Sequence, residues 1–518
     1  MKMTPSFSPR KNDQPSWWFA GFGIVSILLG LIIFSGYFLS QKPSLVGDLS
    51  QIRFTQKTES WQGFYQGENP IGYNHLVIEP RGEEYFLTDE MILNLNLLGQ
   101  INQTRLLLRA ILSLDWSIKQ IEFEINSGQM SFSARANVKP NSIQVVLIAG
   151  EEKISREIPI QSPPFLYTEL VLAEKLSQAG LKPGLKISLP VFEPLTQTVD
   201  YVHLKVLEKE LVSLEEEQIW AYKVEETFKG QSEYLWISDQ GEVVKIWHPS
   251  GFYALKISKE KALNLLSRTK GLPADLITTL AVKSNRWIEE PQQVKYLKIR
   301  LKNISLKGLD LDGEPQRIRG RTLEIFSQKP NFSSGYLLPF SGSEKFKEFL
   351  KPTWQIQSDA PEIIAQAKKI LGEEKDSLKA VKLLTGWVSG YVQDLMVVTV
   401  PNALEVLKQK QGACKEHTVL FTALARASGI PARMVAGLVY SDSYLIKGFY
   451  YHSWAEVYLT DRDGNNGGWF CVDATFNQFP CDATHIRLKI GTLEDMLPLM
   501  QVVGQLEIEV LEYRYDSD

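Results

Sequence analysis

Hydrophobic and polar residues alternate one by one in many short segments between Trp61 and about residue 335. GYNHLVIEP, QIEFEINSGQMSFSARANV and SIQVVLIAG are examples, and turn sequences such as Asn-Ser-Gly and Asp-Gln-Gly separate such segments. Side chains on a strand point alternately to its two faces, so this period of two predicts half-buried antiparallel strands. A helical pattern over 166–184, ending at glycine, interrupts them. We therefore expect a strand-rich region over 56–345, which can be divided into sub-domains at about 56–200 and 201–345.

Near residue 345 the apolar spacing changes to that of helices. Apolar residues recur three and four positions apart over 358–392, in ALEVLKQKQ and over 414–427, which predicts helices with one buried face. Gly429 and Pro431 end the last of these helices, because glycine commonly terminates a helix and proline cannot continue one. Two strand-like runs follow. The C-terminal third is therefore predicted to be of the α+β class.

A third pattern is the stretch WWFAGFGIVSILLGLIIFSGYFL, residues 17–39, which has no charged side chain. As a helix it would be roughly 34 Å long, enough to cross a hydrocarbon layer of about 30 Å. Lys2, Arg10 and Lys11 precede it, and positive charge favours the cytoplasmic side. These features predict a cytoplasmic tail over 1–16, a transmembrane helix over 17–39 and a linker over 40–55. The expected localisation is a single-pass membrane protein whose main body is extracytoplasmic, in the periplasm or at the cell surface.

Composition narrows the function classes. The chain has 518 residues, of which 44% are hydrophobic and 22% charged, so it can form more than one folded unit. Its net charge of −4, without a basic stripe interleaved with aromatics, argues against nucleic-acid binding. Three cysteines are too few for a disulfide scaffold in so long a chain. Cys471 and Cys481 can pair outside the cytoplasm, since Asn477 and Pro480 permit a turn between them, or they can remain free thiols.

Cys414 stands at the start of the helix predicted over 414–427. Backbone N–H groups and the helix dipole favour negative charge at this end of a helix. Beside a protonated histidine, the pKa of a thiol at such a position can fall from about 8.5 to roughly 3.5–7.5. Gly412 is expected to leave room for a substrate backbone. Small buried cysteines are also common in protein cores, so the helix alone leaves both roles open for Cys414.

A histidine and an aspartate follow on two strand-like runs, YHSWAEVYL at 451–459 and GWFCVDATF at 468–476. The turn sequence DRDGNNGG joins these runs into a predicted hairpin. His452 and Asp473 on adjacent strands can then meet over Cys414, as the base and the orienting group of a cysteine triad. The connection of about eight residues leaves the register of the two strands open.

The last third of the chain resembles the transglutaminase-like superfamily, which consists of papain-fold cysteine enzymes. The resemblance lies in ALEVLKQKQGACKEHTVLFTALARASGIPARMVAGLVY, YHSWAEVYL and GWFCVDATFNQFPCDATHIRL. It implies a papain-like, transglutaminase-type domain over 346–490 and a C-terminal extension over 491–518. It also implies that Cys414 is the nucleophile, His452 the general base and Asp473 the residue that orients the histidine.

Two further features bear on this resemblance. The strand-rich region looks like the extracytoplasmic regions attached to some bacterial, membrane-anchored members. Many relatives have an aspartate before the cysteine, an alanine after the histidine and a proline after the aspartate. The residues at these positions here are Ala413, Ser453 and Ala474. None of these differences removes a triad member, but they bear on fine specificity.

No metal and no cofactor are expected. Cys414, His417, His452 and Cys471 lack the short paired spacing of a structural zinc site, and no aspartate cluster has the spacing of a calcium loop. His417, one helical turn after Cys414, is expected to be structural. Glu416 and Glu456 are expected on polar faces.

These features together predict a membrane-anchored cysteine enzyme. It would perform acyl transfer or hydrolysis on amide or ester bonds of protein or peptide substrates, through a thioester at Cys414 that an amine or water resolves. The backbone N–H of Cys414 is the expected oxyanion donor. The alternative is a catalytically retired module for binding or assembly at the cell envelope, in which the strand-rich region, where no catalytic motif is found, recognises the partner.

Overall fold

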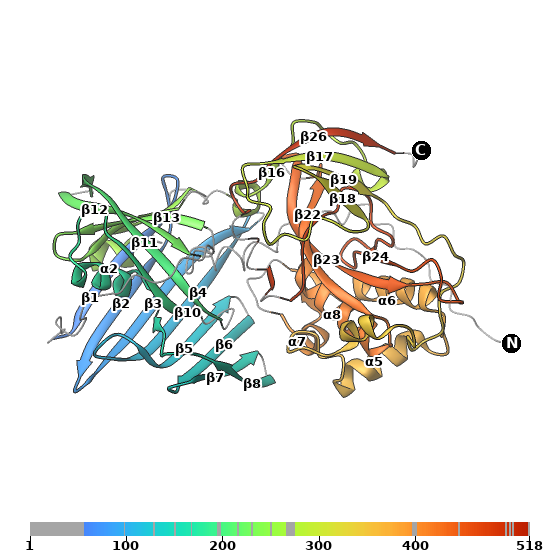
Figure 1. Cartoon of the computed structure of the whole chain (residues 1–518), viewed down its shortest axis with the longest axis horizontal. Coiled ribbons are helices and arrows are strands. Elements are labelled where there is room, and N and C mark those ends of the chain that lie inside the picture. Colours follow the sequence, from blue (N-terminus) through green and yellow to red (C-terminus); the bar gives the residue numbers. More distant parts are fainter. Residues whose placement is uncertain are drawn as a thin grey trace.

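A 15-stranded sheet forms one half of the molecule, and three smaller sheets with the packed helices form the other (Figure 1). The structure is a computed structural model. It describes residues 56–515 apart from residues 98, 128–129, 150–151, 167, 194–197, 215–216, 229–230, 249–250, 266–274, 396–400, 444–445, 493–494, 497–498 and 500–501.

The large sheet confirms the expected strand-rich antiparallel region. Its order is β8-β7-β6-β5-β4-β3-β2-β1-β15-β14-β13-β12-β11-β10-β9, so two meanders run outward from the pairing of β1 with β15. Neighbouring strands are antiparallel, except that β9 and β10 are parallel. The strands are β1 (Thr58–Gln66), β2 (Asn69–Arg81), β3 (Glu84–Leu97), β4 (Gln100–Ser113), β5 (Ile118–Ser127), β6 (Met130–Val138), β7 (Ser142–Ala149), β8 (Glu152–Pro159), β9 (Phe165–Leu166), β10 (Lys186–Glu193), β11 (Thr198–Ser213), β12 (Gln218–Phe228), β13 (Gln231–Ser238), β14 (Val243–Trp247) and β15 (Phe252–Lys256).

One face of the sheet is apolar, as the alternating sequence requires. In β5, for example, Ile121, Phe123 and Ile125 are buried and the residues between them are partly exposed. Helix α2 (Glu169–Gln178) lies against the sheet and buries Leu172 and Leu176 completely. This helix is shorter than the helical pattern over 166–184. Pairing of β10 with β11 continues the sheet across residue 200.

The second half of the chain contains three smaller sheets. One has the order β16-β23-β22-β25, with β24 paired to β23, another has the order β18-β19-β17-β26, and the third is the pair β20-β21. Strand β26, from the expected C-terminal extension, thus pairs with β17. The elements are α3 (Lys259–Leu265), α4 (Leu276–Thr279), β16 (Val282–Lys283), η3 (Pro291–Gln293), β17 (Tyr296–Lys302), β18 (Gln316–Arg319), β19 (Thr322–Phe326), η4 (Glu344–Leu350), β20 (Gln393–Asp394), β21 (Gln411–Gly412), β22 (Ala432–Ser441), β23 (Gly448–Leu459), β24 (Gly468–Val472), β25 (Ile486–Ile490) and β26 (Glu507–Arg514).

Four helices follow the predicted order, and the last of them is central. They are α5 (Pro361–Leu371), α6 (Ser377–Tyr391), α7 (Ala403–Gln409) and α8 (Cys414–Ala427). Helix α8 contacts α5, α6 and α7 as well as β22 and β23, and it buries Val419, Leu420 and Leu424 completely. It ends just before Gly429, whose φ of 78° favours glycine. An added Cβ there would lie 2.4 Å from Pro339, so the predicted helix end is confirmed and the packing also demands glycine.

The prediction of a single-pass membrane protein needs correction. The transmembrane helix expected over 17–39 lies outside the described residues. Within the part of the chain that the structure describes, no helix has the length and apolar character needed to cross a membrane. The structure therefore does not show the membrane-anchored protein that the uncharged stretch suggested.

Candidate active site

Helix α8 places Cys414 at its first residue, where the sequence predicts it. Ala413 before it is extended (φ −105°, ψ −157°), and the Glu416 carboxylate accepts a 2.8 Å hydrogen bond from the Ala413 N–H. Glu416 thereby caps the helix from its first turn. It is completely buried, so the expectation that it lies on a polar face is wrong. Gly412 has φ of 155°, and a Cβ there would lie 2.3 Å from Glu416. The space beside Gly412 is therefore filled by Glu416, and the expectation that it admits a substrate backbone is wrong.

The β23–β24 hairpin supplies the histidine. Its register pairs Ala455 with Val472 and Glu456 with Cys471, which confirms the hairpin and settles the register that the sequence left open. His452 is buried, and its ring stacks on Phe476 with 4.8 Å between ring centroids and an interplanar angle of 10°. This packing restricts rotation of the imidazole.

Asp473 directly follows β24 and is completely buried. Its Oδ2 accepts a 2.7 Å hydrogen bond from Nε2 of His452. Its Oδ1 accepts hydrogen bonds from the backbone N–H groups of Thr475 (2.8 Å) and Phe476 (3.2 Å). The turn after β24 thus fixes one carboxylate oxygen and directs the other to the histidine.

The structure brings Cys414, His452 and Asp473 together, and their electrostatics are coupled. Burial alone would lower the pKa of His452, but the Asp473 carboxylate, together with Cys414, raises it to about 10. Burial alone would raise the pKa of the Cys414 thiol, yet the charge and hydrogen bonding of His452 bring it below its ordinary value. Nε2 of His452 is engaged by Asp473, so Nδ1 is the nitrogen available for the thiol proton. The arrangement favours a thiolate–imidazolium pair.

Ser453 is a site residue that the sequence reasoning did not assign. Its hydroxyl and its backbone N–H both form hydrogen bonds with Cys414 that lower the pKa of the thiol. The Thr418 hydroxyl, 3.5 Å from Oγ of Ser453, donates a 2.7 Å hydrogen bond to the Cys414 carbonyl. The departure from alanine at this position therefore adds a donor beside the sulfur.

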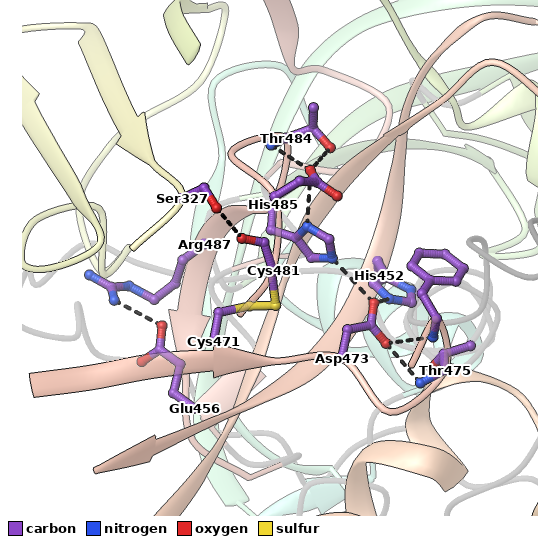
Figure 2. The surroundings of a disulfide bond; sticks show 12 residues. Ser327, His452, Glu456, Cys471, Asp473, Thr475, Cys481, Thr484, His485 and Arg487 are labelled. Atoms are coloured by element: carbon purple, nitrogen blue, oxygen red, sulfur yellow. Dashed lines mark hydrogen bonds and ion pairs between the residues drawn. A yellow bond between two sulfur atoms is a disulfide. The ribbon is translucent and has the colours of Figure 1, made fainter. Parts of the chain in front are cut away.

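A second histidine, His485, lies behind Asp473 (Figure 2). Its Nε2 is 3.2 Å from Oδ2 of Asp473, and its Nδ1 is 3.4 Å from Oδ1 of Asp482. Burial alone would lower the pKa of His485, but the two carboxylates raise it to about 9. The sequence reasoning missed Asp482 and His485, although both lie in the quoted stretch FPCDATHIRL, three residues apart.

Cys471 and Cys481 form a disulfide, with 5.4 Å between their Cα atoms, so one of the two alternatives left open by the sequence holds. The bond joins β24, just before Asp473, to the segment that carries His485 (Figure 2). Among the described residues, Cys414 is the free cysteine. The candidate nucleophile therefore does not take part in the cross-link.

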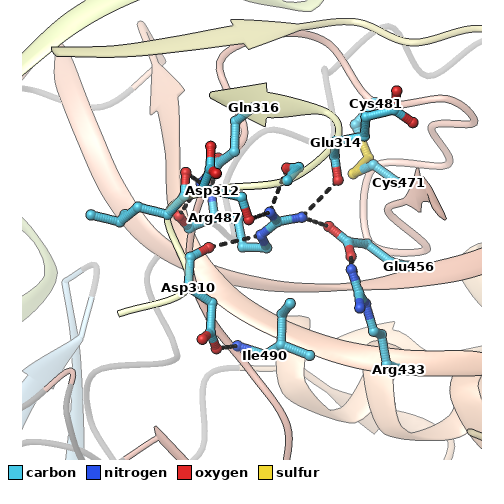
Figure 3. Close-up of polar contacts among 12 residues, drawn as sticks. Asp310, Asp312, Glu314, Gln316, Arg433, Glu456, Cys471, Cys481, Arg487 and Ile490 are labelled. Carbon is cyan, nitrogen blue, oxygen red and sulfur yellow. Dashed lines mark hydrogen bonds and ion pairs between the residues drawn. A yellow bond between two sulfur atoms is a disulfide. The ribbon is translucent and has the colours of Figure 1, made fainter. Parts of the chain in front are cut away.

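Glu456 is buried in an ion-pair network rather than on a polar face, which corrects that expectation (Figure 3). It accepts hydrogen bonds from Arg433 at 2.8 Å and from Arg487 at 3.0 Å. The Arg487 guanidinium also donates to the backbone carbonyl oxygens of Asp310, Asp312, Gly313 and Glu314. Arg487 lies on β25, two residues after His485, so this network fixes the strand next to the second histidine.

Two more ionisable groups lie near the start of α8. His417 is buried, and its Nδ1 is 2.8 Å from the carbonyl oxygen of Ala413, which supports the structural role expected for it. Asp394 lies on β20, opposite Gly412 of β21. Burial, with a smaller effect of the Asp473 charge, raises the pKa of Asp394 to about 7. A carboxyl group that changes charge near neutral pH therefore borders the site.

A metal ion is a poor fit to this geometry. His452, Asp473 and His485 each offer a ligand atom, and these atoms lie within 4.8 Å of one another. However, both Nε2 atoms already point at the same oxygen of Asp473, and a zinc site needs a fourth ligand. The cluster is better described as a chain of hydrogen bonds.

The comparisons with known proteins agree with this geometry. Residues 364–474 match the model of the transglutaminase-like superfamily, and this segment contains Cys414, His452 and Asp473. The similarity to this superfamily is limited to that segment. The match spans about a fifth of the chain. A search of curated proteins found no match.

Three solved structures show weak overall similarity. A proposed cysteine protease from Cytophaga hutchinsonii is 18% identical, with 43% of this chain and 89% of that chain covered and a TM-score of 0.27. A β-barrel-like protein of unknown function from Brucella abortus is 11% identical, with 39% and 93% covered and a TM-score of 0.29. A proposed protease from Parabacteroides distasonis is 10% identical, with 75% and 68% covered and a TM-score of 0.20. Because all three TM-scores are below 0.5, the case for a function depends on the site itself.

Proposed function

We propose that the protein is a cysteine enzyme, a hydrolase or an acyltransferase, that acts on amide or ester bonds of protein or peptide substrates. The observation that carries this proposal is the hydrogen-bonded chain from Asp473 to His452 beside Cys414 at the start of α8. Burying three ionisable groups costs free energy unless they are paired. A module that only binds a partner has no need of this arrangement.

The reaction would proceed in two steps. The Cys414 thiolate attacks the carbonyl carbon, and the N–H of Cys414, at the free N-terminal end of α8, donates to the developing oxyanion. The His452 imidazolium gives its Nδ1 proton to the leaving amine or alcohol, which leaves a thioester on Cys414. His452 then takes a proton from water or an amine, which attacks the thioester and restores the thiolate. Asp473 keeps its negative charge throughout and orients the imidazole.

The experiment is a search for a thioester on Cys414 in the purified full chain. The protein is incubated with p-nitrophenyl acetate and with a pool of glutamine-containing peptides, quenched with acid and mapped by mass spectrometry. We expect an acyl group on Cys414 that neutral hydroxylamine removes. Added primary amine then distinguishes the classes, because an acyltransferase releases an amide and a hydrolase releases an acid.

Variants assign the roles. Cys414→Ala should abolish the adduct, and Asp473→Asn should slow turnover by up to about 10⁴-fold while the fold is retained. Asp463→Asn is the matched control, because Asp463 is exposed in the turn of the same hairpin. A folded protein with a reduced Cys414 that acquires no acyl group from any of these donors would favour the retired binding module instead.

A further inference from the structure

The segment between the disulfide and β25 forms a buried polar group of its own. Asp482 Oδ1 accepts hydrogen bonds from the Thr484 N–H (2.8 Å) and the Thr484 hydroxyl (2.5 Å). This turn places Oδ1 of Asp482 3.4 Å from Nδ1 of His485. Nε2 of His485 reaches Asp473 (Figure 2). Asp482, Thr484 and His485 are all at most 5% exposed. Such a group is costly to bury, so its geometry calls for a specific explanation.

The contacts of His485 fix its position on several sides. Its ring meets Trp454 edge to face, with 5.2 Å between ring centroids. Behind it, Arg487 holds the start of β25 against the backbone of residues 310–314 (Figure 3). The disulfide ties Cys481, the neighbour of Asp482, to the strand that leads into Asp473. His485 is therefore held rigidly relative to the Asp473 carboxylate.

The Asp473 carboxylate needs a second hydrogen-bond donor that holds its Oδ2 in place. Backbone N–H groups fix its Oδ1, whereas Oδ2 must stay in the plane that faces Nε2 of His452. With His452 as the sole donor to Oδ2, the carboxylate could move together with the imidazole. The second donor, at 3.2 Å from the same oxygen, removes that freedom because it comes from a different element of the fold.

We propose that His485, held by Asp482, is a positioning residue that fixes the Asp473 carboxylate and through it the orientation and charge of His452. The inference depends on the proposed function, since it concerns the same reaction. It extends the chain of polar contacts from the three residues found in the sequence to five, since His485 adds a hydrogen bond to Asp473 and Asp482 adds an ion pair with His485.

The positive charge of His485 and its hydrogen bond to Asp473 change the pKa of the Cys414 thiol in opposite directions, which makes the proposal testable. As an imidazolium, His485 repels the imidazolium of His452, so losing the charge alone would stabilise His452 in its charged form and lower the pKa of the Cys414 thiol. Losing the positioning hydrogen bond weakens the support of Asp473 for His452 and raises that pKa. The other charged groups around His485, apart from Asp473 and Asp482, are Glu456 and Arg487, which pair with each other.

The test is the pH profile of Cys414 alkylation by iodoacetamide in the full chain, followed by peptide mapping. The midpoint pH reports the pKa of the thiol and does not depend on reagent access. His485→Phe keeps the ring but has no donor, so we expect the midpoint to rise by about 1 pH unit, a tenfold change in the thiol equilibrium. His485→Gln restores a neutral donor, and its midpoint should lie at or below that of the wild type. His203→Phe, at a histidine in the large sheet, is the matched control and should leave the midpoint unchanged.

The outcomes separate this proposal from the proposed function. A folded His485→Phe variant with an unchanged or lowered midpoint overturns the positioning role, as does a Gln variant that resembles the Phe variant. If neither variant folds, Asp482→Asn takes their place. Its Oδ1 can still accept the hydrogen bonds from Thr484, while the negative charge beside His485 is lost. A midpoint unchanged from the wild type then overturns the proposal. A wild-type midpoint at the value of an ordinary thiol overturns the proposed function, and the positioning role with it.

Discussion

Removing the Cys471–Cys481 disulfide should destabilise the fold around the candidate site by an amount that its loop length sets. The bond closes a sequence separation of 10. In the chain-entropy description, a cross-link over such a loop contributes about 2.7 kcal/mol at 25 °C, because it restricts the unfolded chain. The loop contains Asp473, and Asp482 directly follows it, so the same cross-link also supports the site.

The assay is urea unfolding, followed by tryptophan fluorescence and circular dichroism, with and without reductant. Reduction of the wild type should lower the free energy of unfolding by about 2.7 kcal/mol. The Cys471→Ala/Cys481→Ala variant should lose at least as much, since two buried sulfurs are also removed, and it should not respond to reductant. Cys414→Ala is the control, because it removes a cysteine but keeps the cross-link and so should keep the response.

One result would refute this reasoning. If both thiols are shown to be free by alkylation and the urea midpoint of the wild type is the same with and without reductant, the bond does not stabilise the fold through the loop it closes.

Three further predictions concern the surroundings of the site. Arg487→Met should lower the free energy of unfolding in urea by about 3–5 kcal/mol, because Glu456 loses one buried partner and the carbonyls of residues 310–314 lose their donor. A loss below about 1 kcal/mol would show that these contacts of Arg487 do not stabilise the fold. Gly412→Ala should cost about 1–3 kcal/mol, since its φ is positive and its Cβ would meet the glutamate that caps α8, and an unchanged melting temperature would exclude this clash. The pKa values of His452 and His485 rise to about 10 and about 9 in the fold, above an ordinary value of about 6.5. The stabilisation they provide is therefore complete below about pH 6.5 and is lost as pH rises through 9 to 10, so a free energy of unfolding that stays constant from pH 7 to 10.5 would show that these charges do not support the fold.

Local patterns in the sequence were enough to find much of the candidate site. The apolar stripe after Cys414 predicted α8 and its end at Gly429, because helical spacing and a helix-terminating glycine act within a few residues. The alternation around His452 and Asp473 predicted a hairpin for the same reason. Whether the three residues catalyse a reaction remains a prediction.

Long-range pairing could not be read from local patterns. Arg487 contacts residues 310–316, more than 170 positions earlier in the chain, and no period in the sequence encodes such a contact. The continuous large sheet depends on the pairing of β1 with β15, which are also far apart in sequence. His485 escaped notice because it lies in an irregular segment, where neither helical nor strand spacing shows which way a side chain points.

The most direct test of the account is the pH dependence of Cys414 alkylation in the wild type and in His452→Ala. Because His452 lowers the pKa of the thiol, the midpoint of the wild-type alkylation profile should lie below about 8.5, the pKa of an ordinary thiol. In His452→Ala the midpoint should move above the ordinary value, since burial then acts alone on the thiol. If the wild-type profile has its midpoint at about pH 8.5 and His452→Ala leaves it unchanged, Cys414 and His452 do not form an ion pair, and the proposed catalytic site is wrong.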